Sequence, residues 1–180
     1  FMTVLENDEP VFTYVYGMNL KDGVPEDRTR SNYIHPIYGI DGEIITDDFP
    51  ADHYHHRGLF VAWPQVIAGR DTLDLWHING IEKRFDQWLG RETGPVFARL
   101  GARCGWFIGE KKVASEDFWV TVYQKGGIGR ILDVDVTVSS VSSPLQLVGS
   151  KDPKGYGGFN FRPAPFNEPV ISSNEGIQRD

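Results

Sequence analysis

The chain has 180 residues, of which 40% are hydrophobic and 24% are charged, as in a packed globular protein rather than a disordered one. Its 25 acidic and 18 basic residues give a formal net charge of −7, which disfavours binding to nucleic acid or to anionic membrane surfaces. The longest apolar stretches, such as Gly58 to Pro64, are far shorter than the roughly 20 residues that cross a bilayer. We therefore expect one globular domain over residues 1–180, with neither a membrane nor nucleic acid as its partner.

The single cysteine, Cys104, excludes an internal disulfide framework and a cysteine-rich zinc site. It does not decide between a cytoplasmic and a periplasmic or secreted location, and both stay open. The chain begins at Phe1 without the basic and apolar segments of a signal peptide, so we interpret it as a mature or trimmed product.

Twenty glycines and eleven prolines divide the sequence into short apolar runs, which is the spacing expected of many strands joined by turns. The predicted fold is therefore mostly β. We expect strands at Val11–Tyr16, Tyr33–Tyr38, Glu43–Thr46, Leu59–Trp63, Leu73–Ile78, Val96–Leu100, Arg103–Ile108, Phe118–Tyr123, Ile131–Val138 and Leu145–Val148.

Three segments carry more specific local signals. In Ile131–Val138 aspartates alternate with valines, which predicts a strand with one apolar and one polar face. Apolar residues fall at helical spacing in Ile81–Leu89, which favours a helix there. The sequence GYGG at Gly155–Gly158 lacks the Gly-Lys-Ser/Thr ending of a phosphate-binding loop and predicts a tight turn or bulge.

All the histidines lie in the first half of the chain, and three of them fall in the tetrapeptide HYHH. They are His35, His53, His55, His56 and His77. Neutral imidazole suits both proton transfer near neutral pH and transition-metal binding, so this clustering, with aspartates nearby, favours a functional site. His77 alone is explained equally well as part of a plain strand, LDLWHI.

An extended backbone over HYHH would place His53 and His55 on one face and His56 on the other. With another histidine or a carboxylate as third ligand, His53 and His55 could then form an open site for a divalent transition metal. Arg57 would share their face, where its fixed charge opposes a bound cation but favours a substrate carboxylate or hydroxyl. We therefore rank proton transfer without a metal cofactor above metal chemistry.

Aromatic residues make up 13% of the chain, and most of them are expected in the core. Three tryptophans, Trp63, Trp76 and Trp88, lie close in sequence to the histidines. Such rings can form an apolar floor on which a sugar ring stacks, while charged side chains around them bind its hydroxyls.

Several blocks of the sequence are distinctive when taken together. They are Tyr33-Ile34-His35-Pro36, Asp41-Gly42-Glu43, the run from Asp52 to Gly58, Trp76, and Lys154 to Gly158 with Arg162. In these blocks the chain resembles a bacterial family of soluble proteins known as PmoA-like, or methane oxygenase PmoA. A membrane monooxygenase subunit needs transmembrane helices, so the family name is not to be taken literally for a chain without them.

The resemblance implies an all-β supersandwich similar to galactose mutarotase and other sugar-processing enzymes. In mutarotase-like sites a histidine acts as general acid and a carboxylate as general base to open and close a sugar ring. The histidines of this chain match in kind, whereas no carboxylate is assigned as the base. Members of the family are longer than this chain, which implies a missing C-terminal segment or a partner chain that completes the sheets.

These observations together predict a carbohydrate-active protein with a histidine-centred pocket, of epimerase, lyase or hydrolase type. The residues expected to be catalytic are His35, His53, His55, His56 and Arg57, and those expected to bind the sugar are Asp52, Trp63, Trp76, Lys154 and Arg162. All of these except the tryptophans are expected to meet in one concave site. Two alternatives stay open: a non-catalytic carbohydrate-binding module, and a metal-dependent hydrolase, lyase or oxygenase built on His53 and His55.

Overall fold

A computed structural model describes residues 1–141, 144–166, 171–173 and 176–178, and it confirms the predicted all-β sandwich. The only helix in this part of the chain is the three-residue 3₁₀ turn η1 (Glu26–Arg28). No helix among the described residues is therefore long or apolar enough to span a membrane.

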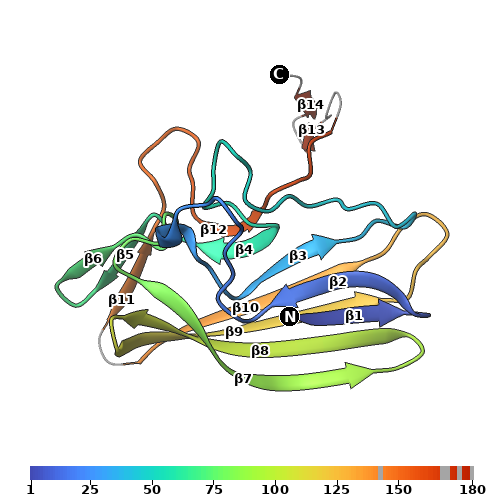
Figure 1. Ribbon diagram of the computed structural model, residues 1–180, viewed down its shortest axis with the longest axis horizontal. Helices are drawn as coiled ribbons and strands as arrows, with labels where there is room; N and C mark the ends of the chain where they lie inside the picture. Colours follow the sequence, from blue (N-terminus) through green and yellow to red (C-terminus); the bar gives the residue numbers. More distant parts are fainter. Residues whose placement is uncertain (142–143, 167–170, 174–175, 179–180) are drawn as a thin grey trace.

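The strands form three antiparallel sheets and a short hairpin (Figure 1). The five-stranded sheet has the order β1 (Met2–Glu6), β2 (Glu9–Val15), β3 (Tyr33–Ile37), β4 (Leu59–Ala62) and β12 (Gly158–Phe161). The four-stranded sheet has the order β10 (Leu132–Ser140), β9 (Lys111–Tyr123), β8 (Phe97–Ile108) and β7 (Glu82–Thr93). The three-stranded sheet has the order β11 (Leu145–Val148), β5 (Gln65–Ala68) and β6 (Asp71–Leu73), and the hairpin pairs β13 (Ile171–Ser173) with β14 (Gly176–Gln178).

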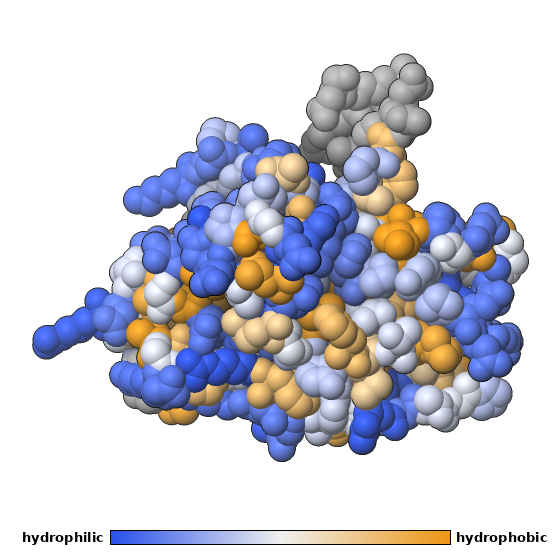
Figure 2. All heavy atoms as spheres, in the orientation of Figure 1, coloured by the Kyte–Doolittle hydropathy of each residue, from blue (hydrophilic) through white to orange (hydrophobic). Residues whose placement is uncertain are grey.

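The five-stranded and four-stranded sheets face each other and bury the core between them. Tyr14 and Ile34 of the first sheet belong to one buried cluster with Leu100 and Phe118 of the second. A neighbouring core cluster continues toward β5 and contains Phe60, Val66, Leu75, Trp76 and Trp106. On the face shown in Figure 2, hydrophilic side chains surround separate hydrophobic patches, as expected when most apolar residues lie between the sheets.

Alternation of apolar and polar residues predicted the strands well where the backbone is regular. Along β10, Val134 and Val136 are partly buried, whereas Asp133 and Asp135 are exposed, as predicted. The two strands predicted at Val96–Leu100 and Arg103–Ile108 are one strand, β8. Gly101 lies between them, and a Cβ there would come within 2.4 Å of the Trp119 ring on β9.

The helix predicted at Ile81–Leu89 is wrong, because all of this segment after Ile81 belongs to strand β7. Two β-bulges interrupt the pairing of β7 with β8, one between Phe85 and Gln87 and one between Trp88 and Gly90. An extra residue in a bulge resets the two-residue alternation. Phe85 and Trp88 therefore lie on one face at a spacing of three, with ring centroids 4.9 Å apart, and this spacing imitates a helix.

Two other predicted strands are wrong as well. Glu43–Thr46 makes only isolated bridges, from Ile44 to Tyr38 and from Thr46 to Pro163. Leu73–Ile78 leaves β6 at Leu73 and enters a turn. By contrast, the turn predicted at Gly155–Gly158 is confirmed as far as Gly157, the residue before β12. Gly155, Gly157 and Gly158 adopt positive φ angles, which glycine reaches without strain.

A buried ion pair lies in the four-stranded sheet, and its lysine also binds the five-stranded sheet. Lys83 on β7 and Glu116 on β9 are 4% and 0% exposed, and their Nζ and Oε2 atoms are 2.6 Å apart. Lys83 also donates to the carbonyl of Val61 on β4 at 2.8 Å, and the indole N–H of Trp106 donates to the Glu116 carboxylate at 3.0 Å. The pair therefore joins β4 of one sheet to three strands of the other.

Removing one partner of this pair should be more harmful than removing both. In Lys83→Met, Glu116 keeps a buried charge without its cation, and we expect a loss of about 3–5 kcal/mol in the free energy of unfolding. The double variant Lys83→Met, Glu116→Leu should regain part of that loss, because no unpaired charge stays buried. Urea denaturation of the three proteins measures both effects, and a double variant less stable than the single one would contradict the argument.

Candidate functional site

The HYHH segment lies in two consecutive turns before β4 rather than in an extended strand. The N–H of His53 donates to the carbonyl of Pro50 at 3.0 Å, and the N–H of His56 donates to the carbonyl of His53 at 2.9 Å. The prediction that His56 points away from His53 and His55 is therefore wrong, because turns do not alternate their side chains as strands do. The His56 ring lies 4.9 Å from that of His53 and 4.5 Å from that of His55, between centroids.

His77 joins these rings from a second segment, which follows β6. Its ring centroid lies 4.5 Å from that of His55. The segment bends because Asp74 accepts the backbone N–H of His77 on its side chain, at 2.9 Å, and exchanges backbone hydrogen bonds with Asn79. We call the four residues His53, His55, His56 and His77 the histidine cluster.

Aromatic rings support the cluster from the side of the core. The Trp76 ring lies 5.5 Å from His56 and 5.2 Å from Tyr156, which comes from the GYGG turn. Trp76 is only 6% exposed, so its predicted role as a floor for a sugar ring is wrong, because little of its surface is free. Tyr156 is the partly exposed ring of this group.

Two carboxylates bind the exposed histidines of the cluster. Asp52 lies 2.8 Å from Nδ1 of His53, and Asp74 lies 2.7 Å from Nδ1 of His77. The His53 and His77 side chains are about half exposed, at 47% and 51%, so a ligand can reach both pairs. Arg162 contacts this group through Asp52, with its Nη2 atom 3.5 Å from the carboxylate.

Asp74 is a site residue that the sequence analysis missed. Asp74 and His77 are three residues apart, and a strand would place them on opposite faces. The available signal was the combination of an aspartate with a histidine three residues later, which suits an aspartate-capped turn.

The environment keeps two cluster histidines neutral. Burial, followed by the neighbouring histidines, lowers the pKa of His55 to about 3 and that of His56 to about 4, and the Arg30 charge acts in the same direction. The hydrogen bond from His53 lowers the pKa of Asp52, so this carboxylate is ionised at neutral pH. The site thus offers neutral imidazoles next to a carboxylate.

Arg57 does not face a ligand, which corrects the catalytic role predicted for it. Its side chain is fully buried and donates to the carbonyl of His56 at 2.9 Å and to those of Tyr54 and Arg28. Its Nε lies 3.4 Å from the Asp48 carboxylate, and its guanidinium lies over the Phe49 ring. The face predicted from an extended segment does not exist, because the backbone turns before Arg57.

The other predicted site residues are His35, Trp63 and Lys154. His35 is partly buried on β3, with Nδ1 3.0 Å from the Thr46 hydroxyl. Trp63 packs against Trp106 in the core, and its carbonyl accepts the N–H of Trp76 at 3.1 Å. Lys154 is exposed on the turn that leads to Tyr156.

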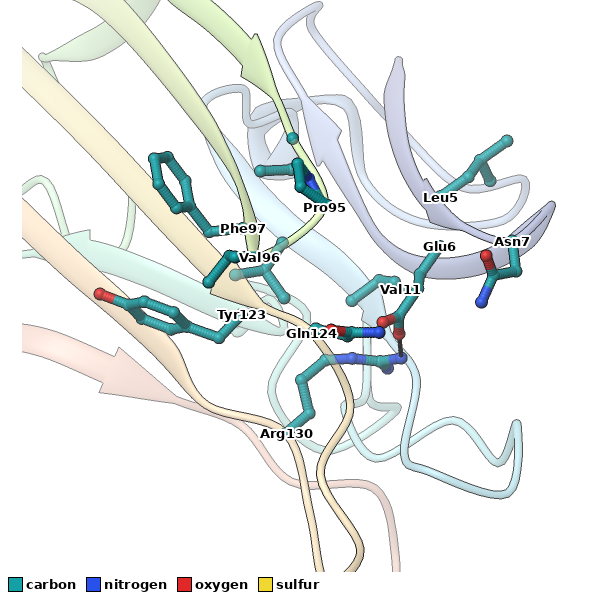
Figure 3. A pocket seen from close by; sticks show the side chains of 13 residues that line it. Leu5, Glu6, Asn7, Val11, Pro95, Val96, Phe97, Tyr123, Gln124 and Arg130 are labelled. Atoms are coloured by element: carbon teal, nitrogen blue, oxygen red, sulfur yellow. Dashed lines mark hydrogen bonds and ion pairs between the residues drawn. The ribbon is translucent and has the colours of Figure 1, made fainter.

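The cavity shown in Figure 3 lies elsewhere in the molecule. Its volume is about 200 Å³, and it is lined by the β1–β2 turn, the start of β8, the end of β9 and Arg130, with no member of the histidine cluster. Within the described ranges, no three His, Cys, Asp or Glu side chains are arranged to hold a metal ion. The metal alternative on His53 and His55 therefore finds no third ligand in place.

The lowered pKa values predict acid sensitivity through His55 and His56. In the unfolded chain these imidazoles protonate near pH 6.5, whereas in the folded protein they stay neutral to about pH 4 or below. The unfolded state binds more protons in this window, so the free energy of unfolding falls as the pH falls from about 6.5 to 4. We expect the variant His55→Gln, His56→Gln to lose stability less steeply than the parent protein in urea denaturation between pH 7 and pH 4.

The titration of Asp48 does not disturb this comparison of pH profiles. Burial raises its pKa to about 6, from 3.8, so its own contribution to stability has the opposite sign between these two values. It is present in both proteins, and its contribution cancels in the difference between them. Parallel pH profiles for parent and variant would contradict the assignment of acid sensitivity to the two histidines.

Comparisons with known proteins place the chain in a family. No curated protein and no solved structure matches it. A family model described as a family of unknown function (DUF6807) matches residues 2–179, almost the entire chain. The chain therefore belongs to the DUF6807 family.

Proposed function

We propose that the protein is carbohydrate-active and that the exposed carboxylate–imidazole pairs of the histidine cluster perform acid/base chemistry on a sugar. One observation carries this proposal. The pairs Asp52–His53 and Asp74–His77 come from two separate segments, and both imidazoles lie next to the His55 ring, at 5.6 and 4.5 Å between centroids.

Each pair has the polarity that a proton-transfer group needs. A carboxylate next to Nδ1 accepts the Nδ1–H, which leaves the Nε2 lone pair free to accept a proton. The same imidazole, once protonated, is stabilised by the carboxylate and can return the proton. Two such groups suffice to open and close a sugar ring, since one removes a hydroxyl proton while the other protonates the ring oxygen.

The surrounding groups suit a neutral, hydroxyl-rich ligand. A neutral imidazole such as that of His55 or His56 presents one donor and one acceptor, which matches a hydroxyl that both donates and accepts. Tyr156 offers a partly exposed ring, supported by Trp76, against which the C–H face of a sugar can pack. Arg162 lies 3.8 Å from Asp47 and 3.5 Å from Asp52, where its charge favours the ionised form of Asp52.

The resemblance to PmoA-like and galactose mutarotase-like proteins belongs to this proposal. The two-layer antiparallel sandwich is compatible with it. The carboxylate that the resemblance lacked at the level of sequence now has two candidates, Asp52 and Asp74. The catalytic role predicted for His35 and the sugar-binding role predicted for Lys154 are part of this proposal.

Exchange between the anomers of reducing monosaccharides, followed by ¹H NMR for neutral hexoses and pentoses, tests the proposal. We expect the protein to accelerate the exchange, and we expect His53→Gln or His77→Gln to reduce the rate by about 10² to 10⁴. Asp52→Asn should also reduce the rate, whereas its matched control, Asp135→Asn on the outer face of β10, should leave the rate unchanged.

Chelation, metal analysis and sugar binding, combined with this assay, separate the alternatives. Acceleration that survives exhaustive chelation supports acid/base chemistry, whereas stoichiometric metal that is lost in His53→Gln would support the metal-dependent alternative. Binding of a sugar without turnover, for oligosaccharides as well, would instead favour the binding module. Neither binding nor turnover of any sugar would overturn the proposal.

A further inference from the structure

Arg57 and Arg28 connect the two segments that bear the histidine cluster. The buried Arg57 guanidinium donates to main-chain carbonyls within the HYHH turns and also to the carbonyl of Arg28. The Arg28 side chain in turn donates to the carbonyl of His77 at 3.0 Å. A continuous series of hydrogen bonds therefore runs from the HYHH turns through residue 28 to the second histidine segment.

Arg30, which is buried, binds the second segment from the side of the core. Its Nη2 donates to the carbonyl of Leu75 at 3.0 Å and to that of Trp76 at 2.7 Å, immediately before His77. Its guanidinium lies 4.9 Å from the centre of the Phe60 ring. Arg28 and Arg30 together thus bind three consecutive carbonyls of residues 75–77.

We propose that Arg28, Arg30 and Arg57 are positioning residues, whose guanidinium groups hold the two loops in the relative position at which His55 meets His77. This inference rests on the proposed function, because the histidine cluster is the site of that function. Among the backbone hydrogen bonds of the described residues, none joins residues 50–57 directly to residues 74–79. The arginine side chains supply this connection instead.

The burial of two of these cations, Arg30 and Arg57, supports the proposal. Arg30 is 4% exposed and Arg57 is fully buried. Arg57 has Asp48 as an ion-pair partner, but Arg30 makes no ion pair with any described residue and relies on carbonyl groups. Burying a guanidinium in this way is unfavourable unless its N–H groups bind acceptors, and its planar fork offers five donors in a fixed geometry, against the three donors of a lysine ammonium.

Nuclear Overhauser contacts between imidazole rings, in protein labelled with ¹⁵N-histidine, test the proposal without any ligand. We expect a contact between His55 and His77 in the parent protein and its loss in Arg57→Lys and in Arg28→Gln. Arg57→Lys keeps the charge and removes the fork, so loss of the contact assigns the effect to hydrogen-bond geometry. The control is Arg103→Lys, which likewise removes a guanidinium fork, here one that binds both carboxylate oxygens of Asp117 at 2.5 and 2.6 Å between β8 and β9.

The outcomes are separable from those of the sugar assay. A His55–His77 contact that persists in folded Arg57→Lys and Arg28→Gln would overturn the positioning role, as would an equal loss in Arg103→Lys. If Arg57→Lys does not fold, Arg28→Gln decides, because the Arg28 side chain is 32% exposed and its loss threatens the core less. Absence of sugar turnover in the parent protein would overturn the proposed function but leave the ring contacts as an independent measurement.

Discussion

Burying a guanidinium is unfavourable unless acceptors bind its N–H groups, and this constraint organises the end of the sandwich that carries the histidines. Arg57 donates from its two terminal nitrogens to the carbonyls of Tyr54 and His56 in the HYHH turns and of Arg28, while its Nε lies 3.4 Å from the Asp48 carboxylate without a hydrogen bond. These turns cannot pair with a sheet, so their carbonyls would otherwise lack partners inside the protein. One side chain thereby satisfies the cation and the turns at the same time.

Buried cations and exposed acid/base groups divide the site into two layers. Arg30 and Arg57 form the buried layer and donate to main-chain carbonyls, so neither is free to bind a substrate. The outer layer consists of the Asp52–His53 and Asp74–His77 pairs, which solvent reaches. The positive charge of Arg30 also disfavours protonation of His55 and His56, so the inner layer influences the chemistry of the outer one.

The sandwich supplies a rigid base for both layers. Trp76 and Phe60, which contact the histidine rings, belong to the same buried cluster as Trp106, the partner of the core ion pair. The histidine rings therefore pack against the same buried cluster of side chains that contacts the ion pair of Lys83 and Glu116. A ligand site built on such packing keeps its geometry better than one on free loops.

The sequence by itself determined the class of fold and the inventory of chemical groups. Alternation in Ile131–Val138 and the run Leu145–Val148 predicted β10 and β11, since the pattern of burial along a regular strand is written in neighbouring residues. The concentration of histidines near residue 55 also identified the segment on which the candidate site is built.

Only the tertiary structure decided how these groups are arranged. Phe85 and Trp88 have helical spacing, but bulges place them on one face of strand β7. Hydrogen bonds from Asp74 and Arg28 hold the expected strand Leu73–Ile78 as a turn, and Arg57 binds carbonyls of the HYHH turns. The same contacts between distant segments explain why Arg57 is a buried structural cation and why His77 belongs to the histidine cluster. Strand periodicity is a local property, whereas the shape of a loop depends on partners that are far away in the sequence and near only after folding.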